Sequence, residues 1–96
     1  MKLDPSILAA LCQKHDVARL RVFGSVARGD DSPESDLDLL VEFAKPKSLV
    51  DLVGIEDEFA EALGRKVDLL TPASLSPYIR DEVLSDARDV YVRPAA

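Results

Sequence analysis

The sequence predicts an α/β fold, in which a small mixed β-sheet is flanked by helices on one or both faces. Helix start signals alternate along the chain with short apolar strands, in the order α-β-turn-β-α-β-α with a final edge strand. The chain has 96 residues, of which 47% are hydrophobic and 31% charged, the balance of one small globular core. We therefore expect a single domain over residues 1–96.

Capping residues and apolar spacing predict three helices. The first begins at Asp4, a capping carboxylate that is followed by proline. The second is capped by Ser48 and ends at Gly64, and the third begins after Ser76. The expected inward residues are Leu8, Leu11, Cys12 and His15 in the first helix, Leu49, Leu52, Val53, Phe59, Ala60 and Leu63 in the second, and Ile79, Val83, Leu84 and Ala87 in the third.

Apolar runs between these helices predict the strands. We expect them at residues 18–23, 37–43, 66–71 and 90–93, and the second of these, LDLLVEF, is the strongest. A brief helical turn at 26–28 and a loop with the sequence GDDSPES at 29–35 connect the first two strands.

The charge balance narrows the class of partner. Twelve basic and 18 acidic residues give a net charge of −6, which repels polyanionic nucleic acid, so we expect no direct binding to DNA or RNA.

No run approaches the roughly 20 apolar residues of a membrane span, and the N-terminus lacks the apolar core of a signal peptide, so we expect a cytoplasmic protein. A core of this size is marginally stable, which leaves room for a partner protein or for a homo-oligomer.

Two aspartates stand where a strand should be apolar. Asp36 and Asp38 open the most apolar strand, and because side chains two residues apart share a face, their carboxylates lie side by side. Such a pair is costly unless a positive charge lies between the carboxylates, and a hard divalent cation is the natural occupant. Asp68 repeats the anomaly in the third strand. If the two strands are neighbours, the three carboxylates predict a site for two Mg²⁺ ions, as in phosphoryl chemistry.

A glycine and a serine end the first strand. Gly24 would let the backbone approach a phosphate closely, and the hydroxyl of Ser25, with nearby backbone N–H groups, would donate hydrogen bonds to it. Arg28, in the loop that follows, is equally well interpreted as a phosphate ligand or as a solvated surface residue.

The spacing of these residues resembles a known family. Gly24 and Ser25, ten intervening residues, and then Asp36 and Asp38 around a leucine resemble the signature of the polymerase-beta-type nucleotidyltransferases. The stretch FGSVARGDDSPESDLDLLVEF is similar to the minimal nucleotidyltransferase (MNT) branch of bacteria and archaea. The resemblance covers nearly the whole chain, because KVDLL and SLSPYIRDEVL fall where that branch has its third carboxylate and its closing helix.

The resemblance implies a role for each residue of the motif. Asp36 and Asp38 would each bind both Mg²⁺ ions, and Asp68 would bind one and help to deprotonate the acceptor. Gly24 and Ser25 would hold the triphosphate of the nucleotide substrate. The C-terminal domain with which larger relatives, such as antibiotic-modifying transferases, bind an acceptor has no counterpart in the sequence, which disfavours an antibiotic substrate.

The resemblance also implies a reaction and a partner. MNT proteins resemble the antitoxin half of a pair whose other half is a HEPN-domain ribonuclease toxin. We therefore expect a Mg²⁺-dependent protein adenylyltransferase that transfers AMP from ATP to a hydroxyl group. The expected acceptor is a tyrosine of a HEPN toxin, and the chain would act as the antitoxin of a type VII-like toxin–antitoxin pair. The alternative is a non-catalytic antitoxin that neutralises its partner by binding alone.

Three polar residues outside the motif also carry expectations. Glu42 lies on the same strand face as the two aspartates but further along the strand, and we expect it to be a surface residue or to form a salt bridge. His15 is expected at the C-terminus of the first helix, where it would interact with the helix dipole. Tyr78 is expected to pack against neighbouring side chains.

Overall fold

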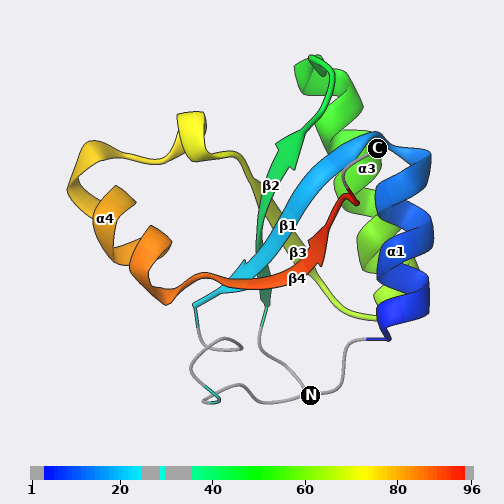
Figure 1. The fold of residues 1–96 in the computed structure, drawn as a ribbon, viewed down its shortest axis with the longest axis horizontal. Coiled ribbons are helices and arrows are strands. Elements are labelled where there is room, and N and C mark those ends of the chain that lie inside the picture. The colour runs from blue at the N-terminus through cyan, green and yellow to red at the C-terminus, as the bar shows by residue number, and fades with distance from the viewer. Residues whose placement is uncertain (1–3, 25–28, 30–35, 95–96) are drawn as a thin grey trace.

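The computed structural model describes residues 4–24, 29 and 36–94, and within them a mixed sheet of four strands lies at the centre of the molecule (Figure 1). The strand order is β3-β2-β1-β4, with β1 antiparallel to both of its neighbours and β2 parallel to β3. The elements are α1 (Pro5–Lys14), β1 (Val17–Phe23), β2 (Leu37–Phe43), α3 (Leu49–Leu63), β3 (Val67–Leu70), the 3-10 helix η1 (Pro72–Ser74), α4 (Pro77–Asp86) and β4 (Arg88–Val92). The α/β fold with a small mixed sheet is confirmed.

The predicted capping residues begin and end the helices. The side chain of Asp4 accepts hydrogen bonds from the first turn of α1, and Ser48 forms a reciprocal capping box with Asp51 at the start of α3. Gly64 ends α3 in the left-handed conformation, and the side chain of Ser76 caps α4. Each side-chain cap joins residues only two or three positions apart, which is why the sequence alone predicts it.

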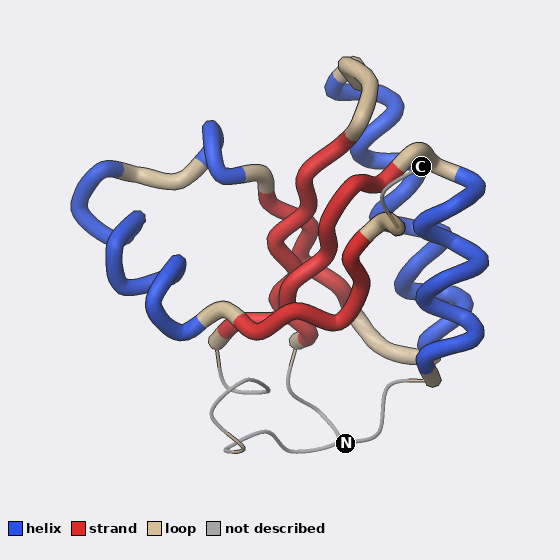
Figure 2. Tube along the Cα trace, in the orientation of Figure 1, coloured by secondary structure: helices blue, strands red, loops and turns tan. Residues whose placement is uncertain are grey.

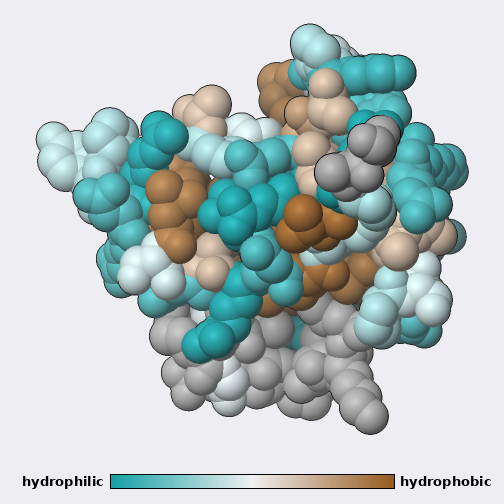
Figure 3. Space-filling model, in the orientation of Figure 1, coloured by the Kyte–Doolittle hydropathy of each residue, from teal (hydrophilic) through white to brown (hydrophobic). Residues whose placement is uncertain are grey.

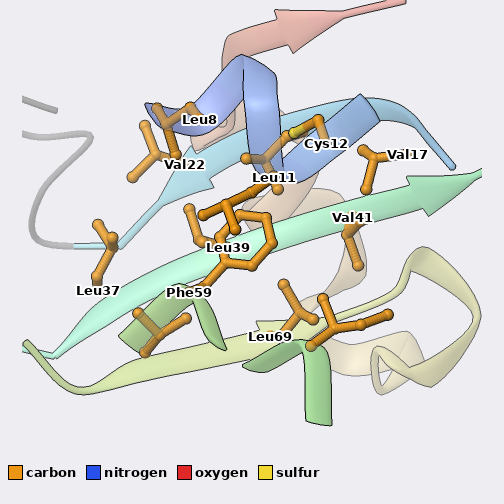
Figure 4. Close-up of a cluster of buried hydrophobic side chains, with 13 residues drawn as sticks. Leu8, Leu11, Cys12, Val17, Val22, Leu37, Leu39, Val41, Phe59 and Leu69 are labelled. Carbon is orange, nitrogen blue, oxygen red and sulfur yellow. The ribbon is translucent and has the colours of Figure 1, made fainter. Parts of the chain in front are cut away.

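Helices cover both faces of the sheet. Figure 2 shows α1 and α3 together on one side of the strands and α4 on the other. The larger core lies under α1 and α3, where Leu8, Cys12 and Phe59 pack on Leu39 from the sheet (Figure 4). The smaller core, on the opposite face, joins Leu40, Leu75 and Val83.

The only cysteine of the sequence, Cys12, lies in the larger core. Its side chain is completely buried, and this burial raises the pKa of the thiol to about 12. The thiol therefore stays protonated and unreactive at neutral pH, as expected from its place on the apolar side of the first helix.

Several packing predictions were wrong at the helix starts. Leu49 and Val53 are 77% and 54% exposed, because the first turns of α3 rise beyond the ends of the strands (Figure 1), and the buried residues of α3 are Ile55 and Phe59. In α4, Val83 is buried as expected but Ile79 is 45% exposed, and Tyr78 lies on the surface instead of packing. Apolar spacing identifies a helical stripe, but it does not show how far the stripe is covered.

The surface is mixed in character. On the face seen in Figure 3, apolar side chains form separate small patches among hydrophilic ones. Each helix among the described residues is too short or too polar to cross a lipid bilayer.

Candidate active site

Asp38 and Asp68 are direct neighbours on two parallel strands. The register of β2 and β3 pairs Asp38 with Asp68, between the pairs Leu37–Val67 and Leu39–Leu69. The leucines and valine on either side are buried in the core under α1 and α3. Because side chains alternate along a strand, both carboxylates project to the other face of the sheet, side by side. The third strand thus lies beside the second, which is the condition under which Asp68 was expected to join the other aspartates.

Gly24 brings the end of β1 against the same carboxylate. Its neighbour Phe23 is the register partner of Asp38, and Gly24 itself has a φ of 72°. A Cβ atom added to Gly24 would overlap Oδ2 of Asp38 and lie 3.3 Å from its Cγ. The site therefore requires glycine here for two reasons, the left-handed backbone and the space that the Asp38 carboxylate occupies.

Asp36 stands at the open edge of the site. It lies immediately before β2, and its side chain is paired with Lys66, with 3.7 Å between Oδ2 and Nζ. The backbone N–H of Leu37 donates a hydrogen bond to the carbonyl of Lys66 at 2.9 Å, which fixes the two segments against each other. Sequence reasoning missed Lys66. Its signal was its position two residues before Asp68, which puts the two side chains on one face of an extended chain.

The donor set suits a hard cation. Asp38 and Asp68 offer adjacent carboxylate oxygens, the ligands that Mg²⁺ prefers, and Asp36 precedes Asp38 by two residues, just before β2 begins. As the side chains stand, no three His, Cys, Asp or Glu residues within ranges 4–24, 29 and 36–94 are grouped closely enough to hold a metal ion. Coordination of metal by all three aspartates therefore stays a prediction.

Two of the predicted phosphate ligands, Ser25 and Arg28, lie outside the described residues. Their roles stay predictions. The helical turn at 26–28 and most of the loop at 29–35 lie outside the described residues as well. Of the described ends of that segment, Gly24 adjoins the carboxylate of Asp38, and Asp36 is paired with Lys66.

Ion pairs occupy the same sheet face beyond the carboxylates. Glu42 accepts a hydrogen bond from Arg21 at 3.2 Å, which confirms its predicted salt bridge. Arg19 donates to Asp89 on β4 at 2.6 Å, and this bond holds the pKa of the Asp89 carboxyl below its usual range. These acidic groups are already paired with arginines, so they are part of the sheet's structure rather than of the carboxylate site.

His15 lies far from the carboxylates. It is the C-terminal cap of α1, as expected, and it precedes Val17, whose register partner Phe43 is at the other end of β2 from Asp38. Its Nε2 atom lies 2.5 Å from Glu58 on α3. The histidine therefore ties two helices together at the end of the sheet opposite the site.

Comparison with known proteins gives the family. The model of the nucleotidyltransferase domain matches residues 5–90. A protein of Methanocaldococcus jannaschii, assigned as a protein adenylyltransferase, is 48% identical over 77 residues, which cover 80% of this chain and 83% of the relative. The protein adenylyltransferase MntA of Thermococcus cleftensis is 37% identical over 91 residues, which cover 91% of this chain and 90% of the relative.

Solved structures share the fold. One of a protein assigned as a minimal nucleotidyltransferase has a TM-score of 0.75 at 39% identity, over 88% of this chain and 86% of that one. A toxin–antitoxin complex with AMP-PNP has a TM-score of 0.81 at 22% identity, over 95% and 75% of the two chains. A complex of a tri-AMPylated Shewanella oneidensis HEPN toxin with an MNT antitoxin has a TM-score of 0.70 at 19% identity, over 93% and 70%. With the family model spanning nearly the whole chain and the carboxylate pair in place, this protein is a nucleotidyltransferase and belongs to the minimal branch of that family.

Proposed function

We propose that this chain is a Mg²⁺-dependent protein adenylyltransferase that transfers AMP from ATP to a hydroxyl group of a partner protein. One observation carries the proposal. Asp38 and Asp68 are neighbours on one sheet face, and Gly24, which follows the end of β1, lies against Asp38. The relatives from M. jannaschii and T. cleftensis, which are named for this activity, support the choice of a protein as acceptor.

Each residue has a part in the proposed transfer. Asp36, Asp38 and Asp68 would hold Mg²⁺, which when bound neutralises charge on the triphosphate and polarises the α-phosphate. The backbone at Gly24, with the Ser25 hydroxyl, would bind phosphate oxygens through donated hydrogen bonds. The site would thus work by positioning and by electrostatics, as other phosphoryl transfers do.

The reaction forms one bond at the α-phosphorus and breaks another. The acceptor oxygen bonds to this phosphorus, the bond to the bridging oxygen of the β-phosphate breaks, and pyrophosphate leaves with the electron pair. The acceptor proton passes to the carboxylate of Asp68. A base is needed for a phenolic acceptor in particular, because the pKa of tyrosine is about 10 and the neutral phenol is a weak nucleophile.

We further propose that the acceptor is a tyrosine of a HEPN-type toxin, and that this chain acts as the antitoxin. The solved complex of an AMPylated HEPN toxin with an MNT antitoxin supports the choice of partner. The shared fold also leaves a second candidate function, because an antitoxin can silence a toxin by covering it without any transfer. The toxin–antitoxin complexes among the structural neighbours are compatible with this function too.

Intact-mass measurement of the partner separates these two functions. A HEPN toxin would be incubated with this chain, Mg²⁺ and ATP, and the expected product is toxin heavier by whole AMP groups and inactive as a ribonuclease. The Asp38→Asn variant should bind the toxin but leave its mass unchanged, since one ligand of the metal is lost. A toxin that is silenced at equal concentrations without any change in mass would support neutralisation by binding alone.

A further inference from the structure

Lys66 places a positive charge at the entrance of the carboxylate site. The register of β2 and β3 begins with Leu37 opposite Val67, so Lys66 stands opposite Asp36, one residue before each strand. The side chains meet there, with 3.7 Å between the Nζ of Lys66 and Oδ2 of Asp36. The backbone therefore holds Lys66 beside Asp36, and only its side chain has to move to reach a ligand.

The ion pair has little structural value. The Lys66 side chain is 74% exposed and that of Asp36 is 42% exposed. A solvated pair at this separation contributes little to stability, because water screens the attraction and two side chains lose freedom. The same weakness makes the ammonium group easy to detach from Asp36 when another cation takes that carboxylate.

We propose that Lys66 is a phosphate-binding residue of the nucleotide site, which pairs with Asp36 in the metal-free protein and moves to a triphosphate oxygen when Mg²⁺ binds. The inference rests on the proposed function. A lysine suits this exchange, since its ammonium is a compact charge on a flexible four-carbon stem. The triphosphate is the anionic group that enters the site, whereas the acceptor hydroxyl is neutral. Asp36, Asp38 and Asp68 repel the triphosphate, and a cation at the entrance reduces that repulsion.

The chain contains a matched control. Lys45 is 72% exposed and lies 4.0 Å from Asp16, so its exposure and its pairing resemble those of Lys66. It follows the other end of β2, beyond Phe43, and therefore lies at the far end of the sheet from Asp38. Loss of Lys45 removes the same charge from the protein without touching the site.

The test measures binding of metal and of nucleotide separately. Mn²⁺ alone would be titrated by electron paramagnetic resonance, and a non-hydrolysable ATP analogue with Mg²⁺ by calorimetry, for Lys66→Ala, Lys66→Arg and Lys45→Ala. Lys66→Ala should bind the analogue about tenfold more weakly, the value of one hydrogen bond to a charged group. It should bind Mn²⁺ as tightly as the wild type or more tightly, because no ammonium competes for Asp36. Lys66→Arg should recover most of the lost analogue affinity, and Lys45→Ala should behave as the wild type.

Each other outcome has a distinct meaning. If Lys66→Ala binds the analogue as well as the wild type does, the inference is wrong, and the proposed function stands as long as wild-type binding requires Mg²⁺. If Lys66→Ala weakens metal and analogue binding together and lowers the melting temperature, Lys66 maintains the structure of the site, and the inference is again wrong. If the wild type binds the analogue equally well in EDTA, the proposed Mg²⁺ site and the inference both fail.

Discussion

The α-carbon of Gly24 lies directly against the carboxylate of Asp38. A Cβ atom at Gly24 would overlap Oδ2 of that carboxylate and lie 3.3 Å from its Cγ, so the end of β1 fits the site only without a side chain. This contact joins two segments that the sequence separates by 14 positions. The identity of residue 24 thus controls where a carboxylate of β2 can stand.

Gly24→Ala should therefore damage activity more than stability. The positive φ of residue 24 costs about 1–2 kcal/mol for a residue with a Cβ, and displacement of Asp38 should reduce transfer by about 100-fold, the effect of a misplacement near 1 Å. Gly64→Ala is the control, because Gly64 has a φ of 68° and, its chain neighbours aside, no atom of the described residues lies within 4 Å of an added Cβ. It should lose similar stability in thermal denaturation and keep its activity. Equal losses of activity in both variants would show that only backbone strain matters.

Asp68→Asn should separate transfer from binding. Removal of the proposed proton acceptor should lower the rate of transfer by about 100-fold or more, while the affinity for the nucleotide should fall much less. The metal-free variant should be as stable as the wild type or slightly more stable, since Asp68 no longer repels Asp38, its register partner. Single-turnover kinetics and melting in EDTA measure these effects. A variant that fails to fold would indicate that Asp68 is structural.

Nucleotide and Mg²⁺ together should stabilise the fold. A ligand that binds only the folded state adds about 2.7 kcal/mol to the free energy of unfolding at a hundredfold excess over its Kd. The rise in melting temperature should require both components, and it should shrink in Ser25→Ala if the hydroxyl binds phosphate. Differential scanning fluorimetry with ATP in EDTA is the control, and an equal shift there would exclude a site built around metal.

Protonation of Glu58 should lower the free energy of unfolding in the acid pH range. A hydrogen bond from Lys14, supported by one from His15, holds the pKa of this carboxyl below its ordinary value of 4.5. A carboxyl with a lowered pKa stabilises the fold above its unfolded pKa, and this contribution is lost as the pH falls through the folded pKa. Glu58→Gln should therefore lose less stability than the wild type below about pH 4.5, as measured by urea denaturation. Glu61→Gln, on the same helix, should follow the wild type, and a Glu58→Gln profile parallel to that of the wild type would contradict the prediction.

Local signals in the sequence determined the elements and the unusual residues of this protein. Strand β2 spans Leu37–Phe43, as its apolar run predicts, and Ser48 and Gly64 bound α3, because capping and left-handed turns depend on a few adjacent residues. Asp38 and Asp68 stood out because aspartate is a poor strand former. Their chemistry predicted a metal site, and the spacing of Asp36 and Asp38 from Gly24 and Ser25 carries the resemblance to the family.

Tertiary structure alone decided which of these residues meet. The pairing of Asp38 with Asp68 depends on the register between two strands that are far apart in the sequence, and the contact of Lys66 with Asp36 follows from that same register. Leu49 has the spacing of a core residue, yet it is exposed, because its helix starts beyond the end of the sheet. Periodicity determines the face of a helix or strand on which a side chain lies. Which residue covers that side chain, or reacts with it, depends on the order and register of the strands and on how far each helix extends over the sheet.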